Sequence, residues 1–213
     1  MDRFERCKML FGQEDFEKIQ KAKIILLGVG GVGGHALDCL YRSGIKDITI
    51  VDFDTYDITN QNRQIGSEEL GAIKVERLER LYPGVKGINA KIDLEWIENN
   101  PLEEYDLILD AIDDIRPKVA IIKRYYKKLI SSGGSAKRID PTKIEYVNIW
   151  KTYNDPFVRK IRDTLKKDGF RKNFKIIFSA ENPKCTTKGS FAGVTGSFGL
   201  TMCSLAINKI LSQ

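Results

Sequence analysis

Short runs of apolar residues alternate along this chain with stretches of helical spacing. Residues 24–27 and 48–51 are apolar runs of strand type, and residues 32–42 between them carry apolar side chains on one helical face. Strands separated by a helix of this length usually pair in parallel. The pattern therefore predicts a strand, helix and strand unit near the N-terminus.

The alternation continues further along the chain. Residues 70–81 have helical spacing, and residues 105–110 form another apolar strand. No linker or repeat divides the 213 residues, which can bury one sizeable core. We expect a single α/β domain with a Rossmann-like, mainly parallel sheet flanked by helices, and with an antiparallel extension in the C-terminal half.

A glycine-rich turn joins the first strand to the first helix. Gly28, Gly30, Gly31 and Gly33 leave the backbone free of side chains where a phosphate could approach, and the helix start offers free N–H groups to an anion. Asp52 ends the next strand, where a carboxylate can accept hydrogen bonds from ribose hydroxyls. This combination predicts nucleotide binding.

The residues after Asp52 favour ATP over a nicotinamide cofactor. Asn60, Arg63 and Gln64 supply amide and guanidinium groups suited to a triphosphate. Lys74, near the start of the predicted helix 70–81, could stabilise charge as pyrophosphate departs, although an ordinary surface lysine is an alternative. We predict that the chain uses ATP as a reagent.

A cluster of acids follows the strand at 105–110. Asp110, Asp113 and Asp114 stand where open α/β sheets bind ligands. A carboxylate together with phosphates is a usual ligand set for Mg²⁺, and we expect Asp113 to face the metal. We expect Asp114 to cap the following helix.

The chain carries a formal net charge of +6 and basic clusters at 123–128, 159–162 and 166–172. Cations interleaved with aromatic residues suit phosphates and bases, but solvated helix faces explain the same pattern. The charge permits a nucleic-acid substrate without requiring one.

Cysteine and histidine usage excludes some classes of site. The four cysteines are scattered singly, so we expect no disulfide framework and a cytoplasmic location. His35 is the only histidine and no Cys-x-x-Cys pair occurs, which leaves few ligands for zinc. Cys185 lies between lysines, but we interpret it as an incidental loop thiol.

Six motifs occur in an order that resembles a known family. The first 135 residues are similar to adenylyltransferases related to ubiquitin-activating enzymes, including activators of sulfur-carrier proteins. The motifs are Arg3-Phe4-x-Arg6, Gly28-x-Gly30-Gly31-x-Gly33, Asp52-x-Asp54, Thr59-Asn60-x-Asn62-Arg63-Gln64, Gly71-x-x-Lys74 and Asp110-x-x-Asp113.

The resemblance implies ATP-dependent adenylation of a carboxylate. It implies that Asp52 holds the ribose, that Asn60, Arg63 and Lys74 hold phosphates, and that Asp113 holds Mg²⁺. Further nucleotide-binding residues that lie in the same motifs are Asp54, Gln64 and the four glycines of the turn.

The resemblance also implies a homodimer, in which Arg6 reaches into the partner subunit's site. Residues 1–135 would form the nucleotide-binding part, and residues 136–213 the part for substrate and dimer contacts. A sulfur-transfer protein is a further partner that the sequence leaves open.

The second half resembles the branch of tRNA threonylcarbamoyladenosine dehydratases. The matching segments include 113–118, 133–136, 139–142, 151–157 and 178–181. That branch activates the carboxylate of threonylcarbamoyl-adenosine in tRNA, and the modification then closes to a ring with loss of water. The segment after residue 181 is shorter than is usual for the branch.

Two other functions stay open at this point. The chain could activate the C-terminus of a ubiquitin-like sulfur carrier, although such enzymes usually contain a zinc-binding cysteine set. A nicotinamide-dependent oxidoreductase is the weakest alternative, because the cluster from Asn60 to Lys74 would be unexplained.

The last segment, residues 189–208, lacks charge and has about membrane-spanning length. Its glycines, serines and threonines make it only weakly apolar. We expect a loop that leads into a buried or dimer-packed helix, and no stable membrane insertion.

Overall fold

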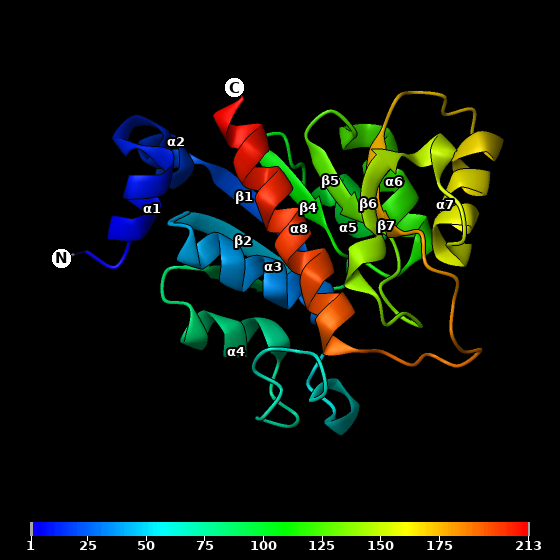
Figure 1. The fold of residues 1–213 in the computed structure, drawn as a ribbon, viewed down its shortest axis with the longest axis horizontal. Coiled ribbons are helices and arrows are strands. Elements are labelled where there is room, and N and C mark those ends of the chain that lie inside the picture. The colour runs from blue at the N-terminus through cyan, green and yellow to red at the C-terminus, as the bar shows by residue number, and fades with distance from the viewer. Residues whose placement is uncertain (1, 213) are drawn as a thin grey trace.

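The computed structural model describes residues 2–212, which form one seven-stranded sheet flanked by helices (Figure 1). The strand order is β3-β2-β1-β4-β5-β7-β6. All neighbouring strands pair in parallel except β6 and β7, which are antiparallel. The expected α/β fold with an antiparallel C-terminal extension is confirmed. The strands are β1 Lys23–Leu27, β2 Asp47–Asp52, β3 Lys86–Asn89, β4 Leu107–Asp110, β5 Leu129–Ser132, β6 Ile144–Asn148 and β7 Lys175–Ser179.

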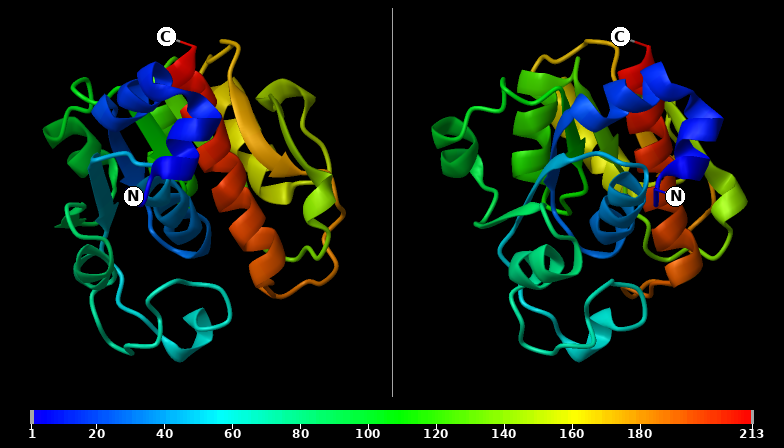
Figure 2. Two further views of the ribbon diagram at one scale, coloured as in Figure 1. Left: turned by 60° about the vertical axis from the view of Figure 1, so that its left-hand side comes forward. Right: turned by 90° about the vertical axis from the view of Figure 1, so that its left-hand side faces the viewer.

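Helices cover both faces of the sheet. The core on one face is built with α2, α3, α4 and α8, and the core on the other face with α5, α6 and α7. Figures 1 and 2 show α3 and α8 side by side across the first face. The helices are α1 Glu5–Phe11, α2 Gln13–Lys21, α3 Gly31–Arg42, α4 Lys74–Leu81, α5 Leu94–Asn99, α6 Ile115–Tyr125, α7 Pro156–Lys167 and α8 Ala192–Leu211.

The central strands are apolar throughout because both faces of the sheet are covered. In β1, Ile24 and Leu26 belong to the α3 side of the core, and Ile25 and Leu27 belong to the α6 side. This is the arrangement expected of a doubly covered parallel sheet, whose strands read as continuous apolar runs. It explains why uninterrupted apolar runs predicted strands correctly.

Helix α8 contains the uncharged C-terminal segment. Its length and composition would suffice to cross a membrane, but more than half of that stretch is buried within the protein. Gly199 lies so close to the backbone of Ala36 in α3 that an added Cβ would stand 2.8 Å from the Ala36 nitrogen. The expectation of a loop leading into a packed helix is confirmed.

Two predicted boundaries were wrong. The helix predicted at 70–81 begins at Lys74, because Gly71 and Ala72 instead form backbone hydrogen bonds with Tyr56, and Gly71 has a φ of +78°. The strand predicted at 105–110 begins at Leu107. In both cases the apolar pattern begins several residues before the helix or strand itself.

The sequence predicted no disulfide framework, but the structure contains one disulfide. Cys39 in α3 and Cys203 in α8 form a disulfide, with their Cα atoms 6.1 Å apart. A separation of 164 residues hides this pair in the sequence, and the close packing of α3 on α8 creates it. Cys7 and Cys185 are free thiols.

Candidate active site

The predicted nucleotide-binding residues gather at the carboxyl edge of the sheet. The glycine turn follows β1, Asp52 ends β2, and Asp110 ends β4. These three strands are neighbours, so their carboxyl ends lie together at one edge of the sheet, and we call the region outside these ends the crevice. In open α/β sheets this edge is where ligands bind.

Backbone packing holds the glycine turn in place. Gly28 has a φ of +85° and donates its N–H to the Val51 carbonyl at 2.8 Å. A Cβ on Gly33 would collide with the Gly28 carbonyl. By contrast, a Cβ on Gly30 would have only the Gln64 Nε2 atom nearby, at 3.8 Å. The turn is therefore packed on its inner side and has room beside Gly30, at the N-terminus of α3.

Asp52 braces the turn from β2. Its carboxylate accepts hydrogen bonds from the backbone N–H groups of Val29, at 2.8 Å, and Asp54, at 2.9 Å. Burial raises the pKa of Asp52, and these hydrogen bonds and the nearby Lys74 oppose that rise. Asp54 in turn pairs with the ammonium of Lys74 at 2.9 Å. The three predicted residues form one connected cluster.

The segment 60–64 packs against the glycine turn. Arg63 donates to the Thr59 carbonyl and to the Asn62 side chain, both at 2.8 Å. Its Cγ atom would be 3.3 Å from a Cβ on Gly31. Gln64 is buried, and its Oε1 atom has no hydrogen-bond partner among the described residues. Asn60 accepts the Asp57 N–H at 3.1 Å and so also caps its own turn.

The acids after β4 have three separate roles. Asp110 is fully buried and binds Lys118 at 2.6 Å and Ser131 at 2.6 Å, so it does not face the crevice. Burial lowers the pKa of Lys118, and Asp110 opposes this shift. Asp114 accepts the Arg116 N–H and caps α6, as predicted. Asp113 is exposed beside them.

Asp113 therefore has the exposure that a metal ligand needs. Among residues 2–212, no group of three or more His, Cys, Asp or Glu side chains is arranged to hold a metal ion by itself. A magnesium ion at Asp113 would need oxygen ligands from a bound triphosphate as well.

Arg6 lies away from the other predicted residues of its own chain. Helix α1 contacts the carboxyl end of α3, where Arg3 lies over the Tyr41 ring and Cys7 contacts the Arg42 carbonyl. The glycine turn is at the opposite end of this 12-residue helix, about 18 Å away. The exposed side chain of Arg6 cannot span that length.

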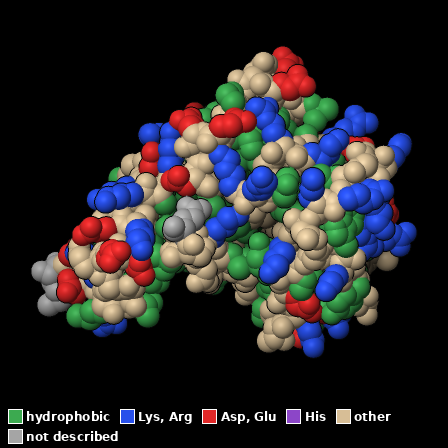
Figure 3. Space-filling model, turned by 90° about the horizontal axis from the view of Figure 1, so that it is seen from above, with side chains coloured by type: hydrophobic (Ala, Val, Ile, Leu, Met, Phe, Trp, Pro, Cys, Tyr) green, Lys and Arg blue, Asp and Glu red, His purple; other side chains and the backbone are tan. Residues whose placement is uncertain are grey.

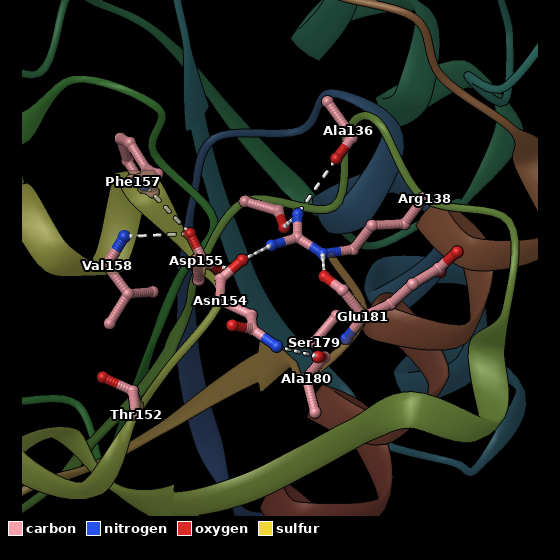
Figure 4. A network of polar contacts seen from close by, with 12 residues as sticks. Ala136, Arg138, Thr152, Asn154, Asp155, Phe157, Val158, Ser179, Ala180 and Glu181 are labelled. Atoms are coloured by element: carbon pink, nitrogen blue, oxygen red, sulfur yellow. Dashed lines mark hydrogen bonds and ion pairs between the residues drawn. The ribbon is translucent and has the colours of Figure 1, made fainter. Parts of the chain in front are cut away.

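A buried arginine gathers the loops on the other side of the crevice (Figure 4). Arg138 donates to the carbonyls of Gly134 at 2.8 Å, Ala136 at 3.0 Å, Asn154 at 3.3 Å and Glu181 at 3.3 Å. It thus connects the loop after β5, the segment before α7 and the loop after β7. The loops after β5 and β7 leave these strands at the carboxyl edge, and Asn154 joins them there because its side-chain amide donates to the Ala180 carbonyl just after β7.

Asp155 is the ionic partner of Arg138. The two side chains are buried and lie 3.4 Å apart. Asp155 also caps α7, since one carboxylate oxygen accepts the N–H groups of Phe157 and Val158. Burial raises the pKa of Asp155, and the cap bonds and Arg138 counteract it.

Thr195 connects the two sides of the crevice. Its methyl group fills the space beside Gly31, and its hydroxyl lies 3.5 Å from that of Ser135 in the loop after β5. Sequence reasoning did not select Thr195, Arg138 or Lys118 as functional residues. Of these three, only Lys118 could have been noticed in the sequence, because it is a charged residue within an otherwise apolar helical face.

Two of the three basic clusters do not line this crevice, while the third, 159–162, lies near the start of α7. Helices α6 and α7 start at the carboxyl edge and run back to the opposite edge, so residues 123–128 and 166–172 lie there. Figure 3 views that opposite edge and shows many Lys and Arg side chains on its right half, towards α6 and α7. Several cations in these clusters are already engaged, since Lys128 donates to three carbonyls and Lys123 pairs with Asp168.

Comparisons with known proteins identify the family of the chain. The chain matches the ThiF family over residues 4–213. It is 33% identical to the tRNA threonylcarbamoyladenosine dehydratase of Bacillus subtilis, over 86% of this chain and 76% of the relative. It is also 33% identical to the molybdopterin-synthase adenylyltransferase of Haemophilus influenzae, but over only 46% of this chain and 44% of that protein.

A similar fold occurs in the Escherichia coli tRNA N6-threonylcarbamoyladenosine dehydratase. The crystal structure of that enzyme in complex with AMP has a TM-score of 0.92 and 32% sequence identity, and the match covers 99% of this chain and 94% of the other. The same enzyme has also been solved in complex with ATP.

Proposed function

The chain belongs to the ThiF family and, within it, to the tRNA threonylcarbamoyladenosine dehydratases, and from this premise we propose that it uses ATP to dehydrate threonylcarbamoyl-adenosine in tRNA. The carboxylate of the modification would first be adenylated, and the modification would then close to a ring. The observation that carries this proposal is the match over nearly the whole chain, including the substrate side.

ATP would occupy the crevice at the carboxyl ends of β1, β2 and β4. In this proposal the glycine turn and the N-terminus of α3 would face the phosphates, with Arg63 and Lys74 as cations beside them. Lys74 already neutralises Asp54, so phosphate and Asp54 would share its charge. Asp113 would hold Mg²⁺, which would neutralise phosphate charge in the bound nucleotide.

The proposed reaction needs positioning and charge neutralisation more than acid–base catalysis. A carboxylate is already a nucleophile at neutral pH, so it can attack the α-phosphorus as pyrophosphate departs. A nitrogen of the same modification then attacks the activated carbonyl carbon and loses its proton, and AMP leaves. This nitrogen is tethered, which gives ring closure a large effective molarity. The net change in the nucleoside is loss of one water.

The direct test is mass spectrometry of nucleosides from tRNA carrying threonylcarbamoyl-adenosine, after incubation with the protein, ATP and magnesium. We expect an ATP-dependent loss of one water from that nucleoside. Arg63→Ala should lower the rate by about 100- to 1,000-fold, the usual loss when one positioned donor is removed. Arg63→Lys, which keeps the charge, is the matched control and should lose less.

A different substrate would give a different result. If the nucleoside keeps its mass, and pyrophosphate exchange appears only when a small sulfur-carrier protein is added, the chain activates a protein terminus instead. The adenylyltransferase relative matches less than half of this chain, which favours the tRNA substrate.

We also infer that Arg6 acts in the site of a partner subunit. Its position at the far end of α3 keeps it out of its own crevice, so a role in catalysis requires a homodimer. In its partner's site, Arg6 would place a cation near the triphosphate. Met9 and Leu10 are large apolar residues exposed on the same helix, a composition that suits a subunit contact.

Mixed dimers test this inference. Arg6→Ala and Lys74→Ala proteins, each weakly active alone, should recover part of the activity when mixed, because one site of each mixed dimer then has both residues. A mixture that stays as inactive as its components would show that Arg6 acts in its own chain. Wild-type protein mixed with Lys74→Ala is the control for subunit exchange.

With tRNA as substrate, the chain would act in the cytoplasm. A sulfur-transfer protein as an additional partner stays a prediction from the family resemblance. Pull-down with such a protein, with and without tRNA, would test it.

A further inference from the structure

A second depression lies beside the crevice, outside the proposed ATP site. It is a groove of about 670 Å³ with walls from segments 139–145 and 180–184 and from Tyr153. Segment 139–145 leads into β6 and segment 180–184 follows β7, so the groove opens at the carboxyl edge of the sheet. It is thus on the same edge as the glycine turn, at the side of the loops gathered by Arg138.

The Arg138 network frames this groove. Arg138 precedes Ile139 in one wall and binds the carbonyl of Glu181 in the other at 3.3 Å. Asn154, the residue after Tyr153, donates its side-chain amide to the Ala180 carbonyl at 3.0 Å. Glu181 also accepts the N–H groups of Ile139, at 3.0 Å, and Asp140, at 2.9 Å. These bonds fix the walls before any ligand arrives.

Tyr153 offers a fixed aromatic surface in the groove. Its side chain is half exposed, and its ring packs edge-on against Phe178 with centroids 5.5 Å apart. Its hydroxyl donates to Glu145 at 3.0 Å, which holds the ring in one orientation. The other large apolar residue of the lining, Ile139, is 60% exposed. A half-exposed ring of this kind is a platform on which a base can stack.

The groove carries charges of both signs. Its lining has three carboxylates, each hydrogen-bonded within the protein: Asp140 accepts from Thr142, Glu145 from Tyr153 and Glu181 from two backbone N–H groups. Lys143 is exposed and forms no ion pair within the described residues, and Lys184 is exposed and pairs with Glu181 at 3.8 Å. Lys143 is therefore the cation best placed to contact a phosphate, and Lys184 would have to leave Glu181 to do so.

We propose that this groove is the subsite for a tRNA nucleotide next to the modified adenosine, with its base stacked on Tyr153 and its phosphates contacted by Lys143 and Lys184. The inference rests on the proposed function and names a place where the tRNA is held. The groove volume falls within the range of about 300–1,000 Å³ that small-ligand sites occupy. The basic clusters 123–128 and 166–172 lie at the opposite edge and do not compete for this role.

The first test is the affinity of Tyr153→Ala for tRNA carrying threonylcarbamoyl-adenosine, measured by fluorescence anisotropy. Loss of one stacked base should weaken binding by about 5- to 140-fold, and Tyr153→Phe should bind like wild type because it keeps the ring. Affinity for AMP should not change in either variant, which also shows that both are folded. Unchanged tRNA affinity in Tyr153→Ala would overturn the proposal.

The second test uses salt. The slope of log K against log salt concentration should become shallower by about 1.4 in Lys143→Ala/Lys184→Ala, since each contact to single-stranded phosphate contributes about 0.7. Lys166→Ala/Lys167→Ala, at the opposite edge, is the matched control and should leave the slope unchanged. Equal slopes in the two double variants would contradict the proposed phosphate contacts. Competition between tRNA and a sulfur-carrier peptide for the groove would contradict them as well.

These measurements are separate from the test of the reaction. Binding does not require turnover, so a protein that binds tRNA through Tyr153 but leaves the nucleoside unchanged would refute the dehydratase function and support the groove. If wild type dehydrates the nucleoside, and Tyr153→Ala keeps full activity and full tRNA affinity, the dehydratase function is supported and the groove proposal is refuted.

Discussion

The glycine turn, on the side proposed to bind ATP (the nucleotide side), is fixed by backbone packing, whereas the loops on the side proposed to hold the substrate (the substrate side) are joined by side-chain hydrogen bonds centred on the buried Arg138. Gly28 and Gly33 touch each other directly, within a few residues of sequence. Arg138 instead connects three segments between residues 134 and 181. Local packing leaves a motif in the sequence, and long-range polar connections do not.

This difference matches the pattern of relatives. The adenylyltransferase that acts in molybdopterin synthesis matches less than half of the chain, while the dehydratase fold matches all of it. Because the six motifs that resemble adenylyltransferases lie in the first 135 residues, we infer that the glycine turn belongs to the part shared with them, and that the loops held by Arg138 are where members of the family differ by substrate.

Breaking the Arg138 connection should have the largest effect on stability. Arg138→Gln leaves the buried Asp155 without its ionic partner, which should lower the free energy of unfolding by about 3–5 kcal/mol. Urea unfolding followed by circular dichroism would measure it. A loss below about 1 kcal/mol, the size typical of exposed ion pairs, would show that the pair is not buried in solution.

The double variant Arg138→Gln/Asp155→Asn separates charge burial from positioning. It removes both charges, so much of the stability should return. The bonds that gathered the three loops stay broken, so tRNA affinity should stay low while AMP affinity is normal. Recovery of tRNA affinity together with stability would mean that Arg138 serves the fold alone.

The nucleotide side can be tested with two glycines of one turn. Gly33→Ala should lower the free energy of unfolding by about 1–3 kcal/mol, because its Cβ would force the Gly28 carbonyl to move. Gly30→Ala has room for its Cβ and should fold like wild type. Thermal unfolding of both variants would check this, and AMP titration should show weaker binding in Gly30→Ala if phosphates lie against that residue.

The sequence predicted the nucleotide side well because its signals are local. Apolar runs identified β1 and β2, and the glycines, Asp52 and the cap at Asp114 each follow from the backbone within a few residues. The predicted roles of Arg63, Lys74 and Asp113 in ATP binding remain predictions. The structure does bring Arg63 and Lys74 to the crevice that the motifs indicated.

What the sequence missed depends on tertiary contacts. The disulfide between Cys39 and Cys203 exists because α3 and α8 pack closely, which no spacing reveals. Asp110 resembled its neighbouring acids, but it is buried at the end of β4 and pairs with the buried Lys118 of α6. The basic clusters 123–128 and 166–172 looked suited to a substrate, but the direction of α6 and α7 places them at the far edge.

The smallest effect on stability is expected at the turn after β4, where Asp114 caps α6. Asp114→Ala removes the cap of α6 and should cost about 0.5–2 kcal/mol of unfolding free energy. Asp93→Ala removes the equivalent cap of α5, which accepts the Trp96 N–H, and should cost a similar amount. Only Asp114→Ala should also weaken binding of ATP with magnesium, because Asp113 and the Ala111 carbonyl that contacts Gly28 belong to the same turn. Equal nucleotide affinity in the two variants, measured by calorimetry, would show that this turn tolerates loss of its cap without moving Asp113, and that backbone packing alone holds the nucleotide side.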